Sequence, residues 1–393
     1  MGKINSLRLV GAPGTNKIMA GELSRLARRA IGGRMAEPKK AGGGTLIYPF
    51  DRQLAELAVH YHRTSARVLW DLAESTAERL EPLYDDLCQA LKGDQRGWLW
   101  DGATISVRAR NVGGFAAGEP QVIGTVKNAI IDTAKEDGIE VTVERNEPDV
   151  LIHARLHNDV ISVSVDLAGR TMAKRGYRTE GAGEAPLRED RAATVAMLSR
   201  YDARSEVLID PMCGSGTIAI EAALMGRGVP LWVAPRAPTI YRLPAFRDRV
   251  GQTHEPLFGD TKPVVIANDI HTPVIELARG NIQRAGVADA VHLLHGDFRD
   301  LSRKRIDKVL SERGHDGKRG VIVCNPPYGT RMGGPELEQL YRDLGAWCAG
   351  FPGWRAAFIV ANPDFVEHFG RRPRISKPLS NGPQKGYFYS FDL

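Results

Sequence analysis

Polar and glycine residues follow four apolar runs in the second half of the chain, where they could bind a ligand. The first group, DPMCGSGT, comes directly after the apolar run EVLID. Its two glycines allow a tight turn and a close approach of a ligand to the backbone. The helix predicted after them adds unpaired N–H groups. The residues expected to contact a ligand here are Asp210, Pro211, Cys213, Gly214, Ser215, Gly216 and Thr217.

Three kinds of ligand compete for this turn. A P-loop needs a lysine before its Ser or Thr, and this turn has none, so a P-loop is excluded. The run Gly214–Ala219 fits the dinucleotide pattern G-x-G-x-x-A, which alone is weak evidence. Asp210 would repel a pyrophosphate, but it suits the cationic amino-acid part of S-adenosylmethionine. This third ligand is favoured, and the later motifs decide between it and a dinucleotide.

The second group is Asp269 with Ile270, at the end of the run VVIAND. A carboxylate at this place can accept hydrogen bonds from both ribose hydroxyls of a nucleoside. Asp269 lies 53 residues after Gly216, whereas the NAD fingerprint expects about 20 residues. The spacing therefore disfavours NAD. A helix N-cap is the structural alternative for Asp269.

The third group is Asp297 with Phe298, after the run VHLLHG. The carboxylate could accept a hydrogen bond from an adenine amine, and the aromatic ring could cover the base. A turn aspartate followed by a core phenylalanine explains the same pair nearly as well.

The fourth group, Asn325-Pro326-Pro327-Tyr328, is the most specific. Two prolines cannot continue a central strand, so they fix a rigid turn after the run GVIVC. The Asn325 side chain and the carbonyls of Asn325 and Pro326 then offer acceptors to an NH2 group, and Tyr328 offers a face for stacking. This arrangement favours methyl transfer to an exocyclic amine of a base, and a purely structural turn is the alternative.

The elements that position these residues follow from the hydrophobic pattern. From residue 206 onward, apolar runs typical of strands alternate with helical patterns, which predicts a doubly wound α/β domain with a mostly parallel sheet. Ligands of such domains bind beyond the carboxyl ends of the strands. Upstream, the spacing predicts three helices, then a strand, a helix that stops at Gly138 and three short strands. The three helices are expected over 18–31, 51–74 and 78–92, and the strand over 104–110.

Composition and charge fit this division. The chain has 393 residues with 53 Lys/Arg against 47 Asp/Glu, a net charge of +6. Residues 1–50 hold nine of the basic and two of the acidic residues, which suits a polyanionic partner such as nucleic acid. The four cysteines form no CxxC pair, so no metal site is expected. No run is long and apolar enough for a membrane helix, and the N-terminus lacks the pattern of a signal peptide. A cytoplasmic protein is expected.

The four groups together resemble the successive motifs of class I S-adenosylmethionine-dependent amino-methyltransferases, as DPMCGSGT, NDI, GDF and NPPY. The upstream runs RTSARVLWDLAE, DVLIHARLHNDVISVSVDLAG, KRGYR and APLRED resemble the THUMP-containing RNA guanine-N2 methyltransferases. The resemblance covers residues 45 to 393, and LPAFRD at 243–248 is similar to the family's insertion before the second strand. Residues 1–45 depart from the family's usual opening, and no second methyltransferase domain is expected.

The resemblance implies a role for each group. Asp210 and the glycine turn would surround the methionine part of the cofactor, Asp269 would hold the ribose, and Asp297 with Phe298 the adenine. Asn325, Pro326, Pro327 and Tyr328 would position the target base. Amine methylation needs no thiolate, so Cys213 and Cys324 are interpreted as packing or backbone positions. Contacts to RNA phosphates are expected from the basic N-terminus and from Lys174, Arg175, Tyr177 and Arg178.

The resemblance also implies four regions and a function. We expect a basic segment over 1–50, a THUMP-containing RNA-binding domain over 51–169, a linker with a connecting helix over 170–195 and a Rossmann-like methyltransferase domain over 196–393. The expected reaction is methylation of guanine N2 in 23S ribosomal RNA by a monomer. A tRNA guanine-N2 methyltransferase, a DNA adenine-N6 methyltransferase and a non-catalytic RNA-binding assembly factor are the alternatives, with a nicotinamide enzyme more distant.

Overall fold

The chain folds into two compact units, each built around one sheet. Unit 1 holds residues 1–11, 22–172 and 230–254, and unit 2 holds residues 12–21, 173–229 and 255–393. A computed structural model of the protein describes residues 2–32, 35–178, 187–231, 238–250, 254–312, 314–315, 319–327, 334–379 and 385–393. Among these residues, no helix is long and apolar enough to cross a membrane.

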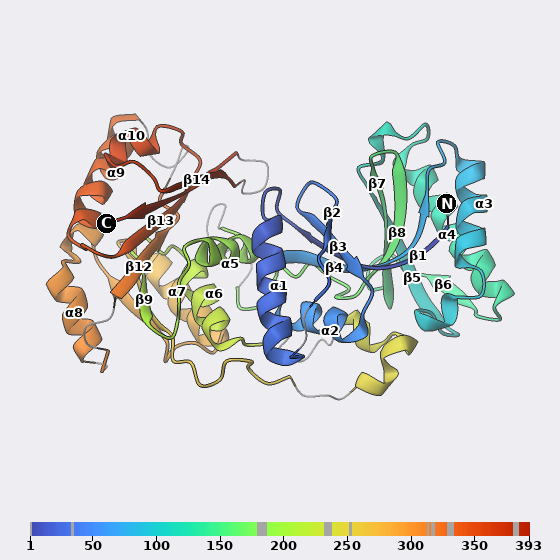
Figure 1. Ribbon diagram of the computed structural model, residues 1–393, viewed down its shortest axis with the longest axis horizontal. Coiled ribbons are helices and arrows are strands. Elements are labelled where there is room, and N and C mark those ends of the chain that lie inside the picture. The colour runs from blue at the N-terminus through green and yellow to red at the C-terminus, as the bar shows by residue number, and fades with distance from the viewer. Residues whose placement is uncertain are drawn as a thin grey trace. The chain divides into compact units, whose positions relative to one another are not determined.

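Unit 1 contains a mixed eight-stranded sheet in the order β2-β3-β1-β4-β8-β7-β5-β6. Helices α3 and α4 pack against each other and against this sheet (Figure 1). The strands are β1 (Lys3–Gly11), β2 (Lys39–Lys40), β3 (Thr45–Pro49), β4 (Ser65–Ser75), β5 (Ala103–Arg110), β6 (Val141–Val143), β7 (Val150–His157) and β8 (Val160–Asp166). The helices are α2 (Arg52–Tyr61), α3 (Leu80–Leu91), α4 (Glu119–Glu136) and the 3-10 turns η1 (Gln95–Gly97), η2 (Val112–Gly114), η3 (Thr239–Tyr241) and η4 (Pro244–Arg249).

The basic segment expected over 1–50 is not a separate region. Strand β1 pairs antiparallel with β4 on one side and with β3 on the other, and β3 also pairs with β2, so the first fifty residues supply three strands of the sheet. Helix α1 (Asn16–Ala30) confirms the helix predicted over 18–31. Its apolar residues Leu23, Leu26 and Ala27 are buried, whereas Arg25, Arg28 and Arg29 on the other face are exposed.

The helix predicted over 51–74 is wrong in its second half. Helix α2 begins at its N-cap Asp51, whose carboxylate accepts from the Leu54 N–H at 2.7 Å, and it ends at Tyr61. The chain then forms β4, which lies between β1 and β8. Pairing along both edges and burial of β-prone residues such as Val68 and Trp70 outweigh the helical spacing.

Residues 230–254 belong to unit 1, although we expected the whole range 196–393 to form one domain. The Tyr241 hydroxyl lies 2.9 Å from Glu56 Oε1 and 2.7 Å from His60 Nε2, and it also contacts His254 Nε2. The two imidazoles stack with their centroids 3.6 Å apart. The phenol can donate to Glu56 and accept from the histidines, so these contacts bind the segment to α2.

Unit 2 is the doubly wound α/β domain that the sequence predicts. Its sheet has the order β11-β10-β9-β12-β13-β15-β14, and the pairs from β11 to β13 are parallel. The strands are β9 (Glu206–Asp210), β10 (Val264–Asp269), β11 (Val291–His295), β12 (Arg319–Cys324), β13 (Arg355–Val360), β14 (Ile375–Pro378) and β15 (Tyr387–Asp392). The helices are α5 (Glu189–Leu198), α6 (Thr217–Arg227), α7 (Thr272–Arg284), η5 (Phe298–Asp300), α8 (Arg303–Ser311), α9 (Gly334–Ala349) and α10 (Phe365–Phe369).

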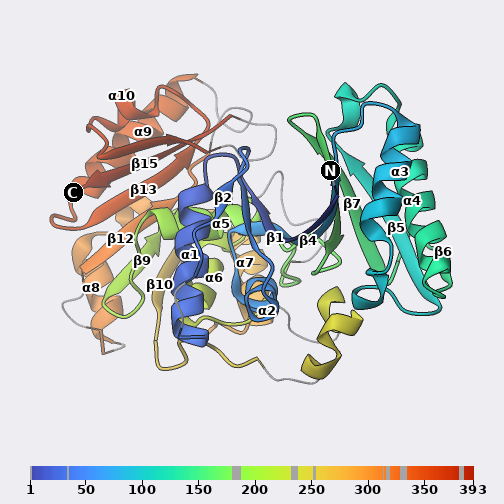
Figure 2. The ribbon, with the colours of Figure 1, turned by 45° about the vertical axis from the view of Figure 1, so that its right-hand side comes forward.

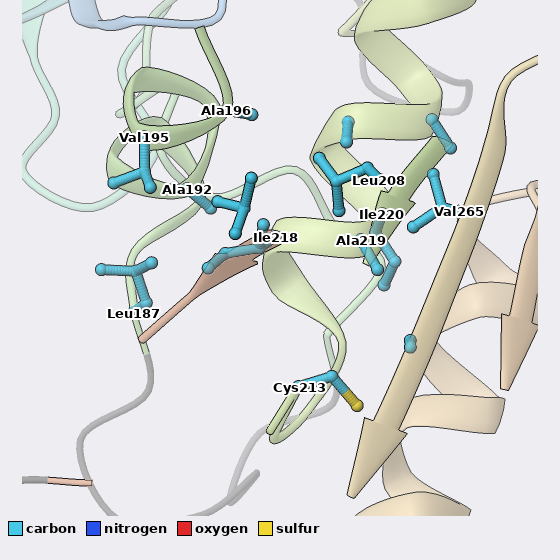
Figure 3. Packing of buried hydrophobic residues seen from close by; sticks show 14 of the residues in the cluster. Leu187, Ala192, Val195, Ala196, Leu208, Cys213, Ile218, Ala219, Ile220 and Val265 are labelled. Carbon is cyan, nitrogen blue, oxygen red and sulfur yellow. The ribbon is translucent and has the colours of Figure 1, made fainter. Parts of the chain in front are cut away.

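Two apolar clusters hold this domain together, one on each face of the sheet. Leu208, Val265 and Val323 contribute to the cluster that includes residues of α5, α6 and α7. Figure 3 shows part of this cluster, to which Leu187, Ala192 and Ile218 belong. Neighbouring strand residues such as Ile209 and Ile322 contribute to the other cluster, with α8, α9 and α10. Alternate residues of each strand therefore pack on opposite faces, which explains why these strands are apolar nearly throughout.

The C-terminal strands of unit 2 were not among the predicted elements. Strand β15 pairs antiparallel with both β13 and β14. The run YFYSF is rich in β-prone aromatic residues, and Phe388 and Phe391 are fully buried on its two faces.

Candidate cofactor and base site

The four predicted groups all follow parallel strands at one edge of the unit 2 sheet. Asp210 ends β9 and Asp269 ends β10, while Asp297 follows β11 and Asn325 follows β12. These four strands are neighbours in the sheet. The carboxyl ends of parallel strands meet at the same edge, so the fold brings the four groups together.

The glycine turn after β9 is fixed by contacts to the neighbouring strand. The Cys213 N–H donates to the Asn268 carbonyl at 2.8 Å, and the Gly214 N–H donates to Asp269 Oδ2 at 2.9 Å. Gly214 and Gly216 have φ of 54° and 80°, a conformation that favours glycine, and Gly216 is the N-cap of α6. The turn thus takes the strand-to-helix form that the sequence predicts.

Asp210 is the most perturbed acid of the site. It is 1% exposed, and its Oδ1 has no hydrogen-bond partner among the described residues. Burial raises the pKa of its carboxyl group to about 8, and the nearby Asp269 acts in the same direction. A cationic ligand would supply both the missing partner and a compensating charge. The orphaned oxygen therefore fits the ammonium group of an amino acid, as expected for S-adenosylmethionine.

Asp269 is held by the backbone at both oxygens. Oδ2 accepts from Gly214, and Oδ1 accepts from the His271 N–H at 3.0 Å. The capping alternative for Asp269 is wrong, because His271 is the N-cap of α7 and no side chain caps that helix. Each carboxylate oxygen can accept a further bond, so these two backbone contacts are compatible with ribose binding. Ile270, beside it, is 53% exposed, which leaves its apolar side chain open to a ligand.

The third group favours its structural alternative. Asp297 Oδ1 accepts from the Arg299 N–H at 2.9 Å, and its carboxylate forms an ion pair with the Arg299 guanidinium at 2.8 Å. Phe298 is buried in the apolar cluster that packs with α8, α9 and α10, and its ring meets the Trp347 ring edge-on. Phe298 is a core residue in this structure, so we correct the expectation that its ring covers adenine.

The proline turn after β12 is partly described. Asn325 and Pro327 are half-buried and Pro326 is buried, whereas Tyr328 lies outside the described residues. Cys324, the residue before Asn325, is fully buried, and its strand β12 pairs with β9, which ends at Asp210. Burial raises the pKa of both the Cys213 and the Cys324 thiols well above its usual range. The two thiols therefore stay protonated, in agreement with their interpretation as packing residues.

Two residues that the sequence analysis missed support these turns. The Asn268 side chain donates to the Pro211 carbonyl at 3.1 Å and to the Gly296 carbonyl at 2.8 Å. The fully buried Tyr341 on α9 donates to the Pro327 carbonyl at 3.3 Å. A polar Asn inside the apolar run VVIAND was a usable signal for the first. The sequence contains no such signal for Tyr341, because this residue occupies an ordinary apolar position of its helix.

The residues expected to contact RNA phosphates in the KRGYR run are mostly buried in unit 2. The Arg175 side chain is 3% exposed and forms an ion pair with Glu221 at 3.4 Å. The Tyr177 hydroxyl donates to the same carboxylate at 3.1 Å. Arg178 donates to Thr217 Oγ1 at 2.6 Å, so it braces the glycine turn.

These contacts overturn the prediction for Arg175, Tyr177 and Arg178, which are packing residues here. They also occupy Thr217, since its hydroxyl accepts from Arg178. Lys174 is exposed, and its contact to phosphate stays a prediction.

Comparisons with known proteins identify the domain. A family model described as the RMKL-like methyltransferase domain matches residues 175–389, more than half of the chain. The chain belongs to this family.

Curated relatives carry the name ribosomal RNA large subunit methyltransferase K/L. The chain is 34% identical over 285 residues to the protein of Legionella pneumophila strain Philadelphia 1, which covers 68% of the chain and 38% of that relative. It is 29% identical over 403 residues to the protein of Syntrophotalea carbinolica, which covers 97% of the chain and 52% of that relative. The chain thus spans about half or less of the length of these relatives.

Solved structures agree on the architecture. The structure of SMU.472, described as a methyltransferase in complex with SAH, superposes with a TM-score of 0.77 at 25% identity, over 100% of this chain and 99% of that one. TrmN from Thermus thermophilus superposes with a TM-score of 0.69 at 20% identity, over 98% and 99%, and shows the same fold. The methyltransferase domain is accordingly of class I, and its cofactor is S-adenosylmethionine. The dinucleotide alternative is not supported.

Proposed function

We propose that the protein methylates the N2 amine of a guanine in large-subunit ribosomal RNA. The observation that carries the chemistry is the proline turn after β12, because β12 pairs with β9, whose last residue Asp210 begins the glycine turn. The names of the relatives support the substrate, because those proteins align with up to 97% of this chain. The proposed substrate puts the reaction in the bacterial cytoplasm, and we propose that the protein acts as a monomer.

The cofactor side of the reaction rests on Asp210, Asp269 and Ile270. Asp210 would bind the ammonium group, since its Oδ1 is buried and lacks a partner. Asp269 would bind the ribose, and the exposed Ile270 would pack against the adenine in place of Phe298. When bound, the cofactor supplies an electrophilic methyl group on its sulfonium sulfur.

The base side of the reaction rests on the proline turn. The Asn325 Oδ1 and the Pro326 carbonyl would accept hydrogen bonds from the two N–H groups of the guanine amine. These two bonds would turn the nitrogen lone pair out of conjugation with the ring and toward the methyl group. Tyr328 would stack on the base after it leaves its helix. The nitrogen lone pair forms the N–C bond, the C–S electron pair remains on sulfur, and an amine proton leaves to solvent. Alignment of this kind can supply roughly 7–11 kcal/mol of the barrier.

Methyl transfer in vitro tests this proposal. The purified protein is given S-adenosylmethionine with a labelled methyl group and either large-subunit RNA, transfer RNA or DNA from cells that lack the gene. We expect label in N2-methylguanosine of large-subunit RNA only. Label in transfer RNA would keep the chemistry and change the substrate, whereas label in N6-methyladenine of DNA would overturn the proposal.

A further inference from the structure

The sheet of unit 1 has one polar face, opposite the apolar face that α3 and α4 cover. Residues that lie opposite each other on paired strands point to the same face. One row in register runs across five strands, and its members are Ser6, Asp71, Ser164, His153 and Arg108. Figure 2 shows α3 and α4 together beside β5 and β6, on one side of the sheet. The buried apolar residues that alternate with the row, such as Ile105 and Ile152, face these helices.

Five arginines lie on this polar face, against three carboxylates. We call these five arginines the arginine face, and they are Arg8, Arg67, Arg108, Arg110 and Arg155. Asp71 and Glu74 pair with Arg8, at 2.8 and 3.6 Å, and Asp166 pairs with Arg67. Arg108, Arg110 and Arg155 have no carboxylate within ion-pair distance among the described residues.

Two of the unpaired arginines are direct neighbours. Arg110 on β5 lies opposite Arg155 on β7 in the parallel pair, and Arg108 lies one row away, opposite His153. Like charges placed directly opposite each other destabilise a sheet unless a counter-charge lies between them. A sheet that keeps this pair therefore gains from an anion that binds between the two guanidinium groups.

Arg155 is also partly desolvated. It is half-buried, its Nε is buried without a hydrogen-bond partner, and its Nη1 has only a long bond to Thr45 Oγ1 at 3.4 Å. Burial lowers the pKa of Arg155, and the charge on Arg8 lowers it further, although the charge on Asp71 acts in the opposite direction. A bound anion would offset both effects. Arg108 and Arg110 are exposed, so the site opens to solvent at the β5 side.

We propose that Arg108, Arg110 and Arg155 bind the phosphodiester backbone of the RNA substrate. Guanidinium groups match phosphate oxygens with two parallel hydrogen bonds, and three of them within two rows fit consecutive phosphates better than a single small ion. The inference rests on the proposed function, because that function supplies the RNA. These arginines take the role first expected of Arg175 and Arg178, whose guanidinium groups contact Glu221 and Thr217 within unit 2.

Paired charge-removing variants test this site. The double variant Arg108→Gln/Arg110→Gln removes the two exposed arginines, and Lys304→Gln/Arg305→Gln removes the same charge from exposed positions of α8 in unit 2. Binding of large-subunit RNA is measured by fluorescence anisotropy over a series of salt concentrations, and binding of S-adenosylmethionine by calorimetry. Circular dichroism confirms that both variants are folded.

We expect the Arg108/Arg110 variant to bind RNA on the order of tenfold more weakly at about 0.1 M salt. Its slope of log affinity against log salt should fall by roughly one to two, because each phosphate contact releases counterions. The α8 variant should bind RNA within about twofold of wild type, and both should bind S-adenosylmethionine unchanged.

Equal RNA binding by wild type and the Arg108/Arg110 variant would overturn the inference and leave the proposed function intact. A wild-type protein that binds S-adenosylmethionine but neither binds nor methylates RNA would overturn both. The measurements on the wild-type protein therefore distinguish failure of the proposed arginine site from failure of the proposed function.

Discussion

At the scale of single residues, Asn325 carries the largest share of the proposed catalysis. Asn325→Ala removes the side-chain acceptor for the target amine and leaves Asp210 and Asp269 in place. We expect kcat for methyl transfer to fall by about 10²-fold or more, as when one pre-positioned hydrogen-bonding group is lost from an active site. Affinity for S-adenosylmethionine, measured by calorimetry, should stay within about twofold. Methyl transfer at the wild-type rate would contradict the assigned role.

Tyr341 is a positioning residue in the same account. Tyr341→Phe keeps the ring in its apolar cluster and removes only the hydrogen bond to the Pro327 carbonyl. We expect kcat to fall roughly two- to tenfold, the worth of one neutral hydrogen bond, with KM for RNA unchanged. Tyr389→Phe, on β15 of the same cluster, is the matched control and should leave kcat unchanged. Equal effects of the two substitutions would indicate a general loss of packing instead.

The burial of Asp210 predicts a pH dependence for cofactor binding. Its pKa is raised to about 8, so the free protein holds this carboxyl group largely protonated at neutral pH. The cationic cofactor binds the ionised form, and binding near pH 7 should therefore release a proton. Affinity should fall by up to about tenfold per pH unit as the pH drops below about 8. Calorimetry in buffers of different ionisation enthalpy measures the released proton, and proton uptake would contradict the role of Asp210.

The same shift has the opposite sign for folding without the cofactor. Because the pKa of Asp210 is higher in the folded protein than its ordinary value of 3.8, this group favours the folded state below about pH 4. That contribution is lost as the pH rises through about 8. S-adenosylmethionine should therefore raise the melting temperature more at about pH 8 than at about pH 6.

At the scale of elements, we expect acid to weaken the contacts between residues 230–254 and α2. Burial and, less strongly, the neighbouring His254 together lower the pKa of His60 to about 3. The folded-state pKa lies below the ordinary value of 6.5, so His60 contributes stability above that pH and loses it as the pH falls toward 3. The other groups that contact these imidazoles or their partners are Glu56, Tyr61, Tyr241 and Arg249.

Thermal unfolding between about pH 7 and pH 4 measures this effect. We expect the melting temperature of the wild-type protein to fall on acidification, and His60→Gln to make that fall shallower, because the substitution removes the titrating group. His368→Gln on α10 is the matched control and should retain the wild-type slope. A His60→Gln slope as steep as that of wild type would contradict the account.

The elements also show what the sequence could and could not predict. Strands β9 to β13 were predicted because both of their faces are buried, which makes them apolar throughout. The boundary between α2 and β4 could not be predicted, because the apolar spacing of Ser65–Ser75 also fits an amphipathic helix. Its pairing with β1 and β8 makes this segment a strand. The positions of the site groups followed from strand order. The ion pair of Asp297 with Arg299 and the burial of Arg175 depend on tertiary contacts that no local pattern encodes.

At the scale of the whole molecule, the two units carry different parts of the proposed reaction. Unit 2 holds the residues assigned to S-adenosylmethionine and the target amine, and unit 1 holds the arginine face. The alignment with the relative from Syntrophotalea carbinolica covers 97% of the chain. Similarity to this named relative therefore extends beyond the methyltransferase domain, and the proposed substrate rests on both units.

One measurement tests the central claim most directly. Total RNA from cells with and without the gene is separated into large-subunit ribosomal and transfer fractions, digested to nucleosides and examined by mass spectrometry. We predict that N2-methylguanosine decreases in the large-subunit fraction of cells without the gene, and that the wild-type gene restores it while Asn325→Ala does not. Unchanged N2-methylguanosine in both fractions, with N6-methyladenine lost from DNA, would contradict the claim.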